Sequence, residues 1–580
     1  MRSLIQYFLF AGLILATGTT FAQGPKTDKQ FNQEEWDALP QAQKDSINKL
    51  LLKKFEEAKK DAASTDEANA NQIIEDALKN VAGTTSLTFN AFPKATFKPE
   101  LTQLVNVEEF TCTRCRNLEL NELFLQLSKL PKLKKVNLQG GDFKTLPNHV
   151  GKLSNLQELD LKDNNFTTLP DSFGLLKKLR VLNVEHNAYL YDDEVYSHIK
   201  NLAVEELNFA NAGLFEINDG IGQLTALHKL DLSGNDIKIL PTSLGRLNML
   251  KSIDLSHNEH LDLTTGLTTL SMISGLQELI LRDCYLTTLP LDFGKLTNLK
   301  KLDLNANKLT ELPLTFGQLT NLEYLNLGYV EMGAHMNKIS ELPATFGNLK
   351  KLKYLNLGGN QLQTLPAGFD GLSELEELNL SLNKFPGFPA SVTKLTKLKW
   401  LDLGLNQAAT LSADIANLKN LEYLNLDGTF FNKPDKKIKT VPAEICQLTK
   451  LKTLSLKDNV IEQLPDCIGS LTQLQKLDLR DNLLTSLPAS FTQLRNLQWL
   501  DLKANDFDQL PKDFAALTSL KEFNYSMNVK INYALEEVKF KQMKQLEYLD
   551  LSYNNLTKEQ ITPLREALPN CKVVNWDYKH

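Results

Sequence analysis

Two short motifs and one long series of carboxylates are the residues of this chain whose types and spacing could carry out chemistry. Cys112-Thr-Arg-Cys115 has the spacing of a redox-active thiol pair. His257 and His260 are the only close pair of histidines, but no third zinc ligand stands near them in the sequence. Asp or Asn also recurs at a regular interval along most of the chain, which raises the question of paired catalytic carboxylates. What each can do depends on the elements that position it.

Those elements come from an internal repeat. Residues 156–164 read LQELDLKDN, and residues 474–482 read LQKLDLRDN. The pattern LxxLxLxxN recurs most often at a step of 23 residues, and the phrase LPxx[FI]gxL follows it in most units. Side chains alternate between the two faces of a strand. Counted from the first residue of a unit, positions 4 and 6 therefore point inward, and positions 3, 5 and 7 point outward. One unit cannot bury its own leucines, whereas stacked units can.

The repeat predicts twenty units and one closing strand. The first residues of the units are Thr84, Val107, Leu133, Leu156, Leu179, Val204, Leu227, Leu250, Leu276, Leu299, Leu322, Leu352, Leu375, Leu398, Leu421, Leu451, Leu474, Leu497, Leu520 and Leu546, and the closing strand begins at Cys571. The units that begin at Leu322 and Leu421 have 30 residues. Their extra residues, 328–336 and 427–436, predict two loops on the rim beside the concave face. Trp576 falls on an inward position of the closing strand.

The first 22 residues differ from all that follows. A positive residue, Arg2, precedes an apolar stretch over residues 4–16, and small residues stand before Gln23, which is typical of a cleaved signal peptide. The stretch is too short for a comfortable membrane span, and no later stretch is apolar enough. We expect an exported protein, secreted or periplasmic or at the cell surface, with no stable membrane insertion. Residues 23–83 predict a polar helical N-terminal region that caps the repeats, 84–576 the repeats themselves, and 577–580 a tail.

These motifs resemble the leucine-rich-repeat superfamily, and most closely the repeat type of the Ras-suppressor and plant Ras-group proteins, which is also common in bacteria. The resemblance covers residues 84–576. It implies an α/β repeat solenoid, an arc with a parallel β-sheet on its concave face, which binds proteins or other macromolecules on that face. Members with this repeat type are often cytoplasmic, so the signal peptide is a departure. The fold alone does not name a ligand.

The position of each chemical motif within the repeat changes its interpretation. Cys112 falls on position 6 and Cys115 on position 9, both core positions, so a structural role is favoured. Cys446 and Cys467 lie on the return legs of adjacent units, and a disulfide between them stays open. The recurring carboxylates occupy position 5, as at Asp160, so they indicate architecture or a general polar surface rather than a catalytic pair.

The chain also lacks nucleophile-elbow, phosphate-loop and zinc-protease motifs. We therefore predict no catalytic residues, no metal and no cofactor. The net charge of −6 and the absence of a basic stripe argue against nucleic acid as a partner.

Position 3 carries the strongest sign of binding. The eight units from Leu133 to Leu299 have no aromatic residue there, whereas six of the ten units from Leu322 onward do. Outward Tyr and Trp suit interface anchors. Glycine at position 7 is expected to leave space beside the rings, although tolerated variation at position 3 is a competing explanation. The predicted contact residues are Tyr324, Tyr354, Trp400 and Tyr423 at position 3, Leu382 and Leu405 at position 8, and Phe430 and Phe431 in the second long loop.

The sequence therefore predicts an exported, non-catalytic binding protein that captures a protein partner on its concave face. A glycan-binding or cell-wall-binding module, in which the same rings act as stacking platforms, is the alternative.

Overall fold

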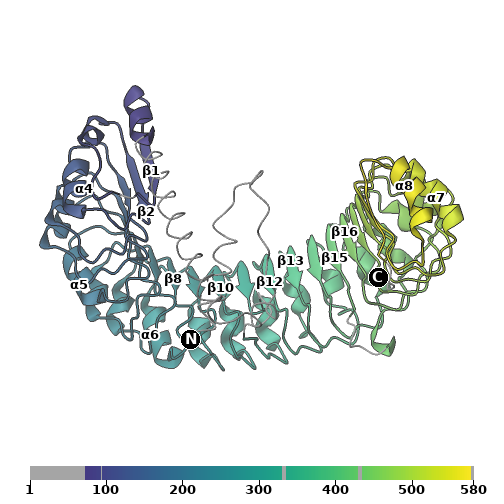
Figure 1. Ribbon diagram of the computed structural model, residues 1–580. Coiled ribbons are helices and arrows are strands. Elements are labelled where there is room, and N and C mark those ends of the chain that lie inside the picture. The colour runs from purple at the N-terminus through teal and green to yellow at the C-terminus, as the bar shows by residue number, and fades with distance from the viewer. Residues whose placement is uncertain (1–71, 93, 330–334, 429–433, 577–580) are drawn as a thin grey trace, which may run out of the picture. The chain divides into compact units, whose positions relative to one another are not determined.

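The computed structural model describes residues 72–92, 94–329, 335–428 and 434–576. These residues belong to one compact unit, Ala70–His580. The predicted signal peptide and most of the predicted N-terminal region lie outside the described residues. Figure 1 shows the strands side by side along the inner side of the unit, with the helices on its outer side.

The described residues hold twenty-one strands. They are β1 (Ser86–Asn90), β2 (Glu109–Thr113), β3 (Lys135–Asn137), β4 (Glu158–Asp160), β5 (Val181–Asn183), β6 (Glu206–Asn208), β7 (Lys229–Asp231), β8 (Ser252–Asp254), β9 (Glu278–Ile280), β10 (Lys301–Asp303), β11 (Tyr324–Asn326), β12 (Tyr354–Asn356), β13 (Glu377–Asn379), β14 (Trp400–Asp402), β15 (Tyr423–Asn425), β16 (Thr453–Ser455), β17 (Lys476–Asp478), β18 (Trp499–Asp501), β19 (Glu522–Asn524), β20 (Tyr548–Asp550) and β21 (Lys572–Val574).

Helices follow the strands on the return legs. The α-helices of the repeats are α4 (Leu120–Leu127), α5 (Asp192–Ile199), α6 (Leu263–Met272), α7 (Tyr533–Gln542) and α8 (Lys558–Ala567). The 3₁₀ helices are η1 (Pro99–Gln103), η2 (Asn148–Lys152), η3 (Asp171–Leu175), η4 (Asp219–Gln223), η5 (Thr242–Arg246), η6 (Leu291–Lys295), η7 (Leu314–Gln318), η8 (Ala344–Asn348), η9 (Phe369–Gly371), η10 (Val392–Lys394), η11 (Ala413–Asn417), η12 (Pro434–Lys436), η13 (Ala443–Gln447), η14 (Ile468–Ser470), η15 (Ala489–Gln493) and η16 (Phe514–Ala516).

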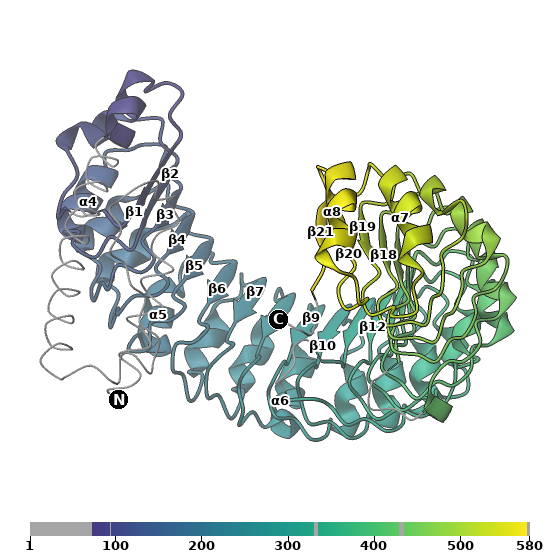
Figure 2. The same ribbon diagram turned by 45° about the vertical axis from the view of Figure 1, so that its right-hand side comes forward.

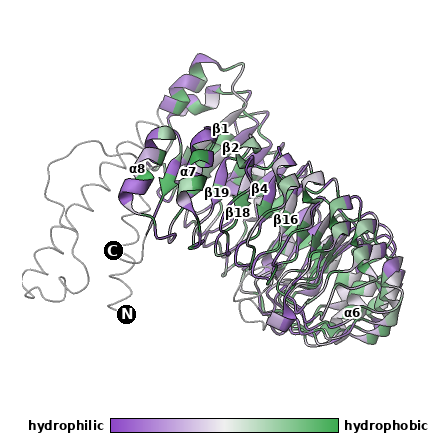
Figure 3. Ribbon diagram, turned by 90° about the vertical axis from the view of Figure 1, so that its right-hand side faces the viewer, coloured by the Kyte–Doolittle hydropathy of each residue, from purple (hydrophilic) through white to green (hydrophobic). Residues whose placement is uncertain are grey.

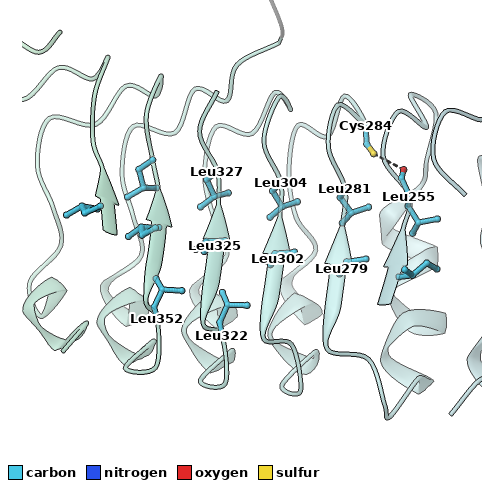
Figure 4. Packing of buried hydrophobic residues seen from close by; sticks show 14 of the residues in the cluster. Leu255, Leu279, Leu281, Cys284, Leu302, Leu304, Leu322, Leu325, Leu327 and Leu352 are labelled. Atoms are coloured by element: carbon cyan, nitrogen blue, oxygen red, sulfur yellow. Dashed lines mark hydrogen bonds between the residues drawn. The ribbon is translucent and has the colours of Figure 1, made fainter. Parts of the chain in front are cut away.

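Each strand pairs in parallel with the next strand along the chain, so the unit contains one continuous parallel sheet. The first twenty strands begin at position 3 of their units, as predicted. Leucines at positions 4 and 6, such as Leu302 and Leu304, are fully buried and lie beside Leu325 and Leu327 of the next strand (Figure 4). The predicted solenoid fold is therefore confirmed.

In most units the asparagine at position 9 forms hydrogen bonds that join the unit to the one before it. In Asn383, Nδ2 donates to the carbonyl oxygens of Leu357 (2.9 Å) and Leu380 (3.1 Å), and Oδ1 accepts from the backbone N–H of Leu362 (2.9 Å). Leu357 and Leu362 belong to the preceding unit. Such bridging bonds recur at Asn164, Asn187, Asn235, Asn258, Asn307, Asn360, Asn406, Asn459, Asn482 and Asn505. These amides satisfy buried backbone groups that no sheet bond reaches.

Cys284 stands at position 9 in place of asparagine. Its thiol donates to the carbonyl oxygens of Leu255 (3.2 Å) and Arg282 (3.4 Å), the first of which is drawn in Figure 4. Burial raises the pKa of this thiol to about 12, so the proton needed for these bonds is retained. Cys284 therefore keeps the donor function of the asparagine.

The convex side is ordered by a second row of side chains. Phe293, Phe316, Phe346 and Phe369 stack with ring centroids 6.1 Å apart and nearly parallel planes. Most 3₁₀ helices follow a Leu-Pro phrase in units of 23 or 30 residues, whereas α4 to α7 occur in units of 25 or 26 residues. Two or three extra residues thus complete α-helical turns on the outer side, as Figure 2 shows at α4, α5 and α6.

The first repeat is covered by a helix over residues 72–79. Its Ile74 and Ala77 are buried in the core, and the Asn106 side chain donates to the Val81 carbonyl (3.3 Å). At the other end, α8 is largely hydrophilic in Figure 3 and buries Ile561 and Leu564. Apolar side chains at both ends thus join the continuous core.

The predicted register of the closing strand is wrong by one residue. Lys572 pairs with Tyr548, so it occupies position 3, and Trp576 falls on outward position 7 with 68% of its surface exposed. The strand, around Val573 and Val574, lacks the spaced leucines that identified the others. A slip of one residue turns every side chain to the other face.

Four of the six cysteines form two disulfides. Cys112 and Cys115, with Cα atoms 5.8 Å apart, are bonded to each other and fully buried. Their predicted core positions are confirmed, although the bond between them was not predicted. Cys446 of η13 is bonded to Cys467, at the N-terminus of η14, with Cα atoms 5.9 Å apart. This second bond, which the sequence left open, ties the return legs of two adjacent units.

Replacing the bridging amide should weaken the solenoid locally. The Asn383→Ala variant leaves two buried carbonyl oxygens and one N–H without this partner, at a cost of about 2–4 kcal/mol. Hydrogen exchange should therefore accelerate in β12 and β13 more than in distant strands. The Asn348→Ala variant, at an exposed position on the convex side, is the control. Equal exchange in both variants would contradict the bridging role.

Mild reduction of the folded protein should open the Cys446–Cys467 bond first, because Cys467 is half-buried whereas Cys112 and Cys115 are inaccessible. Its loss should cost roughly 3 kcal/mol, as expected for a short closed loop. Alkylation followed by mass spectrometry identifies the thiols released, and the midpoint of thermal unfolding should fall with them. In the Cys446→Ala/Cys467→Ala variant, the reductant should no longer change the midpoint. Earlier alkylation of Cys112 would contradict this order.

Candidate functional site

The predicted contact residues at position 3 lie in two adjacent pairs on the sheet. Strand pairing sets Tyr324 beside Tyr354, and Trp400 beside Tyr423. Glu377 on β13 stands between the two pairs. We call Tyr324, Tyr354, Trp400, Tyr423, Leu382 and Leu405 the aromatic patch. All six are described, and they come from five consecutive strands or the turns that follow them.

Within each pair the rings stack on one another. The centroids of Tyr324 and Tyr354 are 4.4 Å apart with planes at 4°, and those of Trp400 and Tyr423 are 4.9 Å apart at 8°. Burial raises the pKa of both the Tyr324 and the Tyr354 hydroxyls. Burial, helped by the nearby carboxylates of Asp402 and Asp427, raises the pKa of Tyr423 to about 12. The rings are half-buried and uncharged at neutral pH, as suits preformed contact surface.

The side chains at position 5 lie on the same face as the rings. They are more buried than side chains of a solvated polar surface. Asn326 and Asn356 accept hydrogen bonds from the backbone N–H groups of Gly328 (3.2 Å) and Gly358 (2.9 Å), two residues further along each strand. Asp402 does the same with Gly404 (2.8 Å). Burial raises the pKa of Asp402 to about 6. The carboxylates and amides of position 5 therefore brace the strand ends, which supports their architectural interpretation.

The glycines at position 7 do not leave the space that was expected beside the rings. A Cβ atom on Gly328 would lie 2.2 Å from the Asn356 side chain, and one on Gly404 would lie 2.8 Å from that of Asn425. The neighbouring position-5 amide fills the space at each glycine. The prediction was wrong because it did not count the side chain on the next strand.

The two leucines of the aromatic patch have an unusual backbone. Leu382 and Leu405 adopt φ values of 52° and 58°, in the left-handed region. Positive φ recurs at this position in most described units, where the residue is usually glycine, aspartate, asparagine, histidine or alanine and is bulky at Arg114, Met527 and Tyr553. This conformation is costly for bulky side chains. Leu382 is 36% exposed and Leu405 is half-buried, so the concave rim presents apolar side chains that the backbone disfavours.

The two long loops are described only in part. Phe430 and Phe431 lie outside the described residues. In the first loop, His335 contacts Asp283 through Nδ1 (3.1 Å), and its ring lies 4.4 Å from that of Tyr285. The sequence analysis missed this contact because no repeat rule links residues 52 positions apart.

The two histidines of the close pair contact different carboxylates. His257 Nδ1 lies 3.4 Å from Asp283, and His260 Nδ1 lies 2.5 Å from Asp236. In the described part of the chain, no cluster of three or more His, Cys, Asp or Glu side chains has a geometry that could hold a metal ion. The two histidines therefore contact neighbouring units separately and do not form one shared ligand site.

Comparisons with known proteins agree with this architecture. A family model described as a leucine-rich repeat region matches residues 88–204, 340–454 and 436–575, and two further leucine-rich-repeat models match residues 274–329 and 226–247. No curated protein matches the chain significantly. Among the described residues, no helix has the length and apolar character needed to cross a bilayer.

Solved structures with similar folds include a bacterial protein and two plant receptors. A leucine-rich-repeat protein of Leptospira interrogans is 27% identical, with 86% of this chain and 98% of that chain covered and a TM-score of 0.46. The plant peptide hormone receptor RGFR1, in complex with RGF2, is 23% identical over 85% and 90%, with a TM-score of 0.48. The ectodomain of the Arabidopsis receptor kinase HAESA, in complex with an extended IDA peptide hormone, is 25% identical over 78% and 75%, with a TM-score of 0.50.

Neutralising Asp402 should stabilise the protein at high pH. Because the folded pKa lies above the ordinary value of 3.8, the folded state binds more protons between pH 4 and pH 6, and its stability falls as the pH rises through this range. Asp402→Asn keeps the oxygen that accepts from Gly404 and removes the buried charge. We expect a gain of roughly 1–3 kcal/mol at pH 8 that shrinks toward pH 4, measured by urea unfolding at both pH values.

The exposed Asp513 provides the control for this experiment. Asp513→Asn removes the same charge elsewhere in the solenoid and should leave the pH dependence unchanged. A pH-independent effect of Asp402→Asn would show that its buried carboxyl does not titrate in this range.

Proposed function

Because the chain belongs to the leucine-rich-repeat proteins, we propose that it is an exported, non-catalytic scaffold that captures a polypeptide partner on its concave sheet, with the aromatic patch as the main contact. In this proposal the repeat is of the type found in the Ras-suppressor and plant Ras-group proteins, and the protein is a secreted bacterial-type member of that group. Residues 1–22 form the signal peptide, 23–83 the N-terminal cap and 84–576 the solenoid in this proposal. Phe430 and Phe431 extend the contact onto the rim.

The observation that carries the proposal is that two stacked ring pairs and two apolar side chains on left-handed backbone, Leu382 and Leu405, come together on five consecutive strands. A bulky side chain in this conformation costs about 1–2 kcal/mol relative to an ordinary one. Glycine or aspartate fills the same position elsewhere in this solenoid, for example at Gly359 and Asp458, so the fold does not require leucine there. Strain of this kind concentrates at functional sites. An apolar contact beside the two ring pairs offsets the cost only when a partner covers it.

Two further observations support an exported binder of polypeptides. Disulfides persist in oxidising compartments, and the two in this chain favour a location outside the cytoplasm. The HAESA ectodomain, at a TM-score of 0.50, has a peptide hormone ligand. A continuous parallel sheet with half-buried rings on its concave face offers the same general kind of surface to an extended segment of a partner.

The stacking within the ring pairs limits the surface that the glycan alternative could use. Tyr324 and Tyr354 cover one face of each other, as do Trp400 and Tyr423, so each ring keeps a single open face. The apolar side chains of Leu382 and Leu405 also suit a polypeptide better than a hydroxylated ligand. A glycan array probed with the mature chain is the direct comparison.

The proposal predicts that replacing Leu382 and Leu405 has opposite effects on partner capture and on stability. The mature chain is used as bait for cell-surface proteins, the partner is identified by mass spectrometry, and its affinity is then measured in purified form. Leu382→Asn/Leu405→Asn should raise the midpoint of thermal unfolding, because asparagine tolerates positive φ. The same variant should weaken capture at least tenfold. Tyr354→Ala/Trp400→Ala should abolish capture and leave the midpoint nearly unchanged.

Ala504 offers a matched control, because it adopts φ 52° at the same position in a unit outside the aromatic patch. Ala504→Asn should also raise the midpoint but leave capture unchanged. Full capture by both patch variants would remove the site assignment, and binding to the glycan array instead of to a protein would overturn the choice of partner class.

A further inference from the structure

A carboxylate stands between two rings in the centre of the aromatic patch. Glu377 is exposed, and its strand pairs with that of Tyr354 on one side and with that of Trp400 on the other. Its charge is felt by the first ring, because burial raises the pKa of the Tyr354 hydroxyl and the charge of Glu377 raises it further. A ring, a carboxylate and a ring therefore follow one another on three consecutive strands.

The same order occurs a second time near the end of the solenoid. Glu522 is exposed at position 3 of β19, between Trp499 on β18 and Tyr548 on β20. Glu377 and Glu522 are six strands apart, which is about 29 Å along the sheet at ~4.8 Å per strand. Two ring–carboxylate–ring sites thus share one row of the concave face.

These carboxylates differ from Glu158 and Glu278, two other position-3 glutamates, because no ion pair to them forms within the described residues. Glu158 pairs with Lys135 (3.1 Å) and Glu278 pairs with Lys301 (2.6 Å), lysines that stand at position 3 on neighbouring strands. At Glu377 and Glu522 the neighbouring strands carry rings instead, and the described part of the chain forms no ion pair with either carboxylate. Glu377 and Glu522 therefore lack the neighbouring lysine that Glu158 and Glu278 have.

The rings that flank Glu522 already bind cations on their other faces. Lys476 Nζ lies 5.3 Å from the Trp499 centroid, and Lys572 Nζ lies 5.9 Å from that of Tyr548. Both lysines stand on the strands away from Glu522. The ring faces are thus turned along the row and accept ammonium groups there. Because the two faces of a ring are parallel, the opposite faces of Trp499 and Tyr548 are turned along the row toward Glu522.

The gap between the flanking rings is wide enough to admit one planar cation. Tyr354 and Trp400 are two strand spacings apart, about 9.6 Å. A planar group held between two rings at van der Waals contact needs about 7–8 Å. Guanidinium is planar, stacks on aromatic faces and forms paired hydrogen bonds to a carboxylate, whereas ammonium is a compact charge without a stacking face.

We propose that each ring–carboxylate–ring site holds one arginine side chain of the partner polypeptide, sandwiched between the two rings with its guanidinium on the glutamate. The first site is Tyr354–Glu377–Trp400 and the second is Trp499–Glu522–Tyr548. This inference rests on the proposed function and names the residue type that the partner must present. It also extends the contact from the aromatic patch to the second site.

The test uses the mature chain labelled with 5-fluorotryptophan and followed by fluorine NMR. The chain has four tryptophans, and single Trp→Phe variants assign the resonances of Trp400 and Trp499. The probe is Nα-acetyl-arginine methylamide, which should shift both resonances in a saturable way. The citrulline analogue has the same shape without the charge and should bind at least tenfold more weakly, and the lysine analogue at least threefold more weakly.

Each glutamate should control only its own site. Glu377→Gln should weaken the response of Trp400 at least tenfold and leave that of Trp499 unchanged, and Glu522→Gln should do the reverse. Glu206→Gln is the matched control, because Glu206 occupies position 3 between Val181 and Lys229, where there are no rings. The thermal midpoint of each variant establishes that it is folded.

Three results would overturn the inference: no saturable shift with the arginine probe, equal binding of the citrulline analogue, or equal binding of the lysine analogue. An unchanged Trp400 response in Glu377→Gln would do the same. These failures are distinct from a failure of the proposed function. If the arginine sites fail while Tyr354→Ala/Trp400→Ala still abolishes partner capture, the binding surface stands without this specificity. If the probe binds but partner capture ignores the aromatic patch, the proposed function fails alone.

Discussion

The side-chain amide at position 9 is the interaction on which the rest of the structure depends. Buried leucines contribute most of the free energy of folding, but apolar contacts are not directional. The amide of Asn383 contacts backbone groups of its own unit and of the unit before it, so it holds neighbouring units in one register. Because the same bridge recurs along the sheet, residues at equal positions form straight rows. Rows of rings, carboxylates and lysines exist only because this spacing is kept.

The rows of equivalent positions differ in their role. Some positions stabilise the fold, and position 3 is available for binding. Positions 4 and 6 are buried and leave little freedom of sequence. Position 5 is taken up by bracing the strand ends, even where a buried carboxylate such as Asp402 makes that costly at neutral pH. Position 3 alone is both ordered by the sheet and free of a structural duty. Variation there can create a binding surface without disturbing the core, and this is where the aromatic patch lies.

The sequence alone predicted those parts of the fold that leucine spacing encodes. The 23-residue period placed the first twenty strands correctly, and it identified Cys112 and Cys115 as buried. The closing strand was misplaced because it has valines where the other strands have spaced leucines. The Cys112–Cys115 bond was not predicted, because a register fixes the face on which a side chain lies but not the distance between two sulfur atoms.

Features of the site that involve two strands were harder to foresee. The amides that fill the space beside Gly328 and Gly404 come from the next unit, 28 and 21 residues away, and become visible only when the strands are paired. The strained backbone of Leu382 has no signature in the sequence beyond an unusual residue at a turn position. The aromatic residues themselves were found from the sequence because position 3 is defined by a single unit.

The spacing between Glu377 and Glu522 has a consequence for the length of ligand that the sheet can select. The two carboxylates are joined by six consecutive strand pairings rather than by a flexible linker, so the span between them is nearly fixed. An extended chain covers at most about 3.3–3.6 Å per residue, so about nine residues must separate two side chains that reach both points. A chain of that length gains the effective concentration of a second attachment, and a shorter one gains nothing. If each site binds one arginine as proposed, the sheet selects partners whose two arginines are separated by about nine residues.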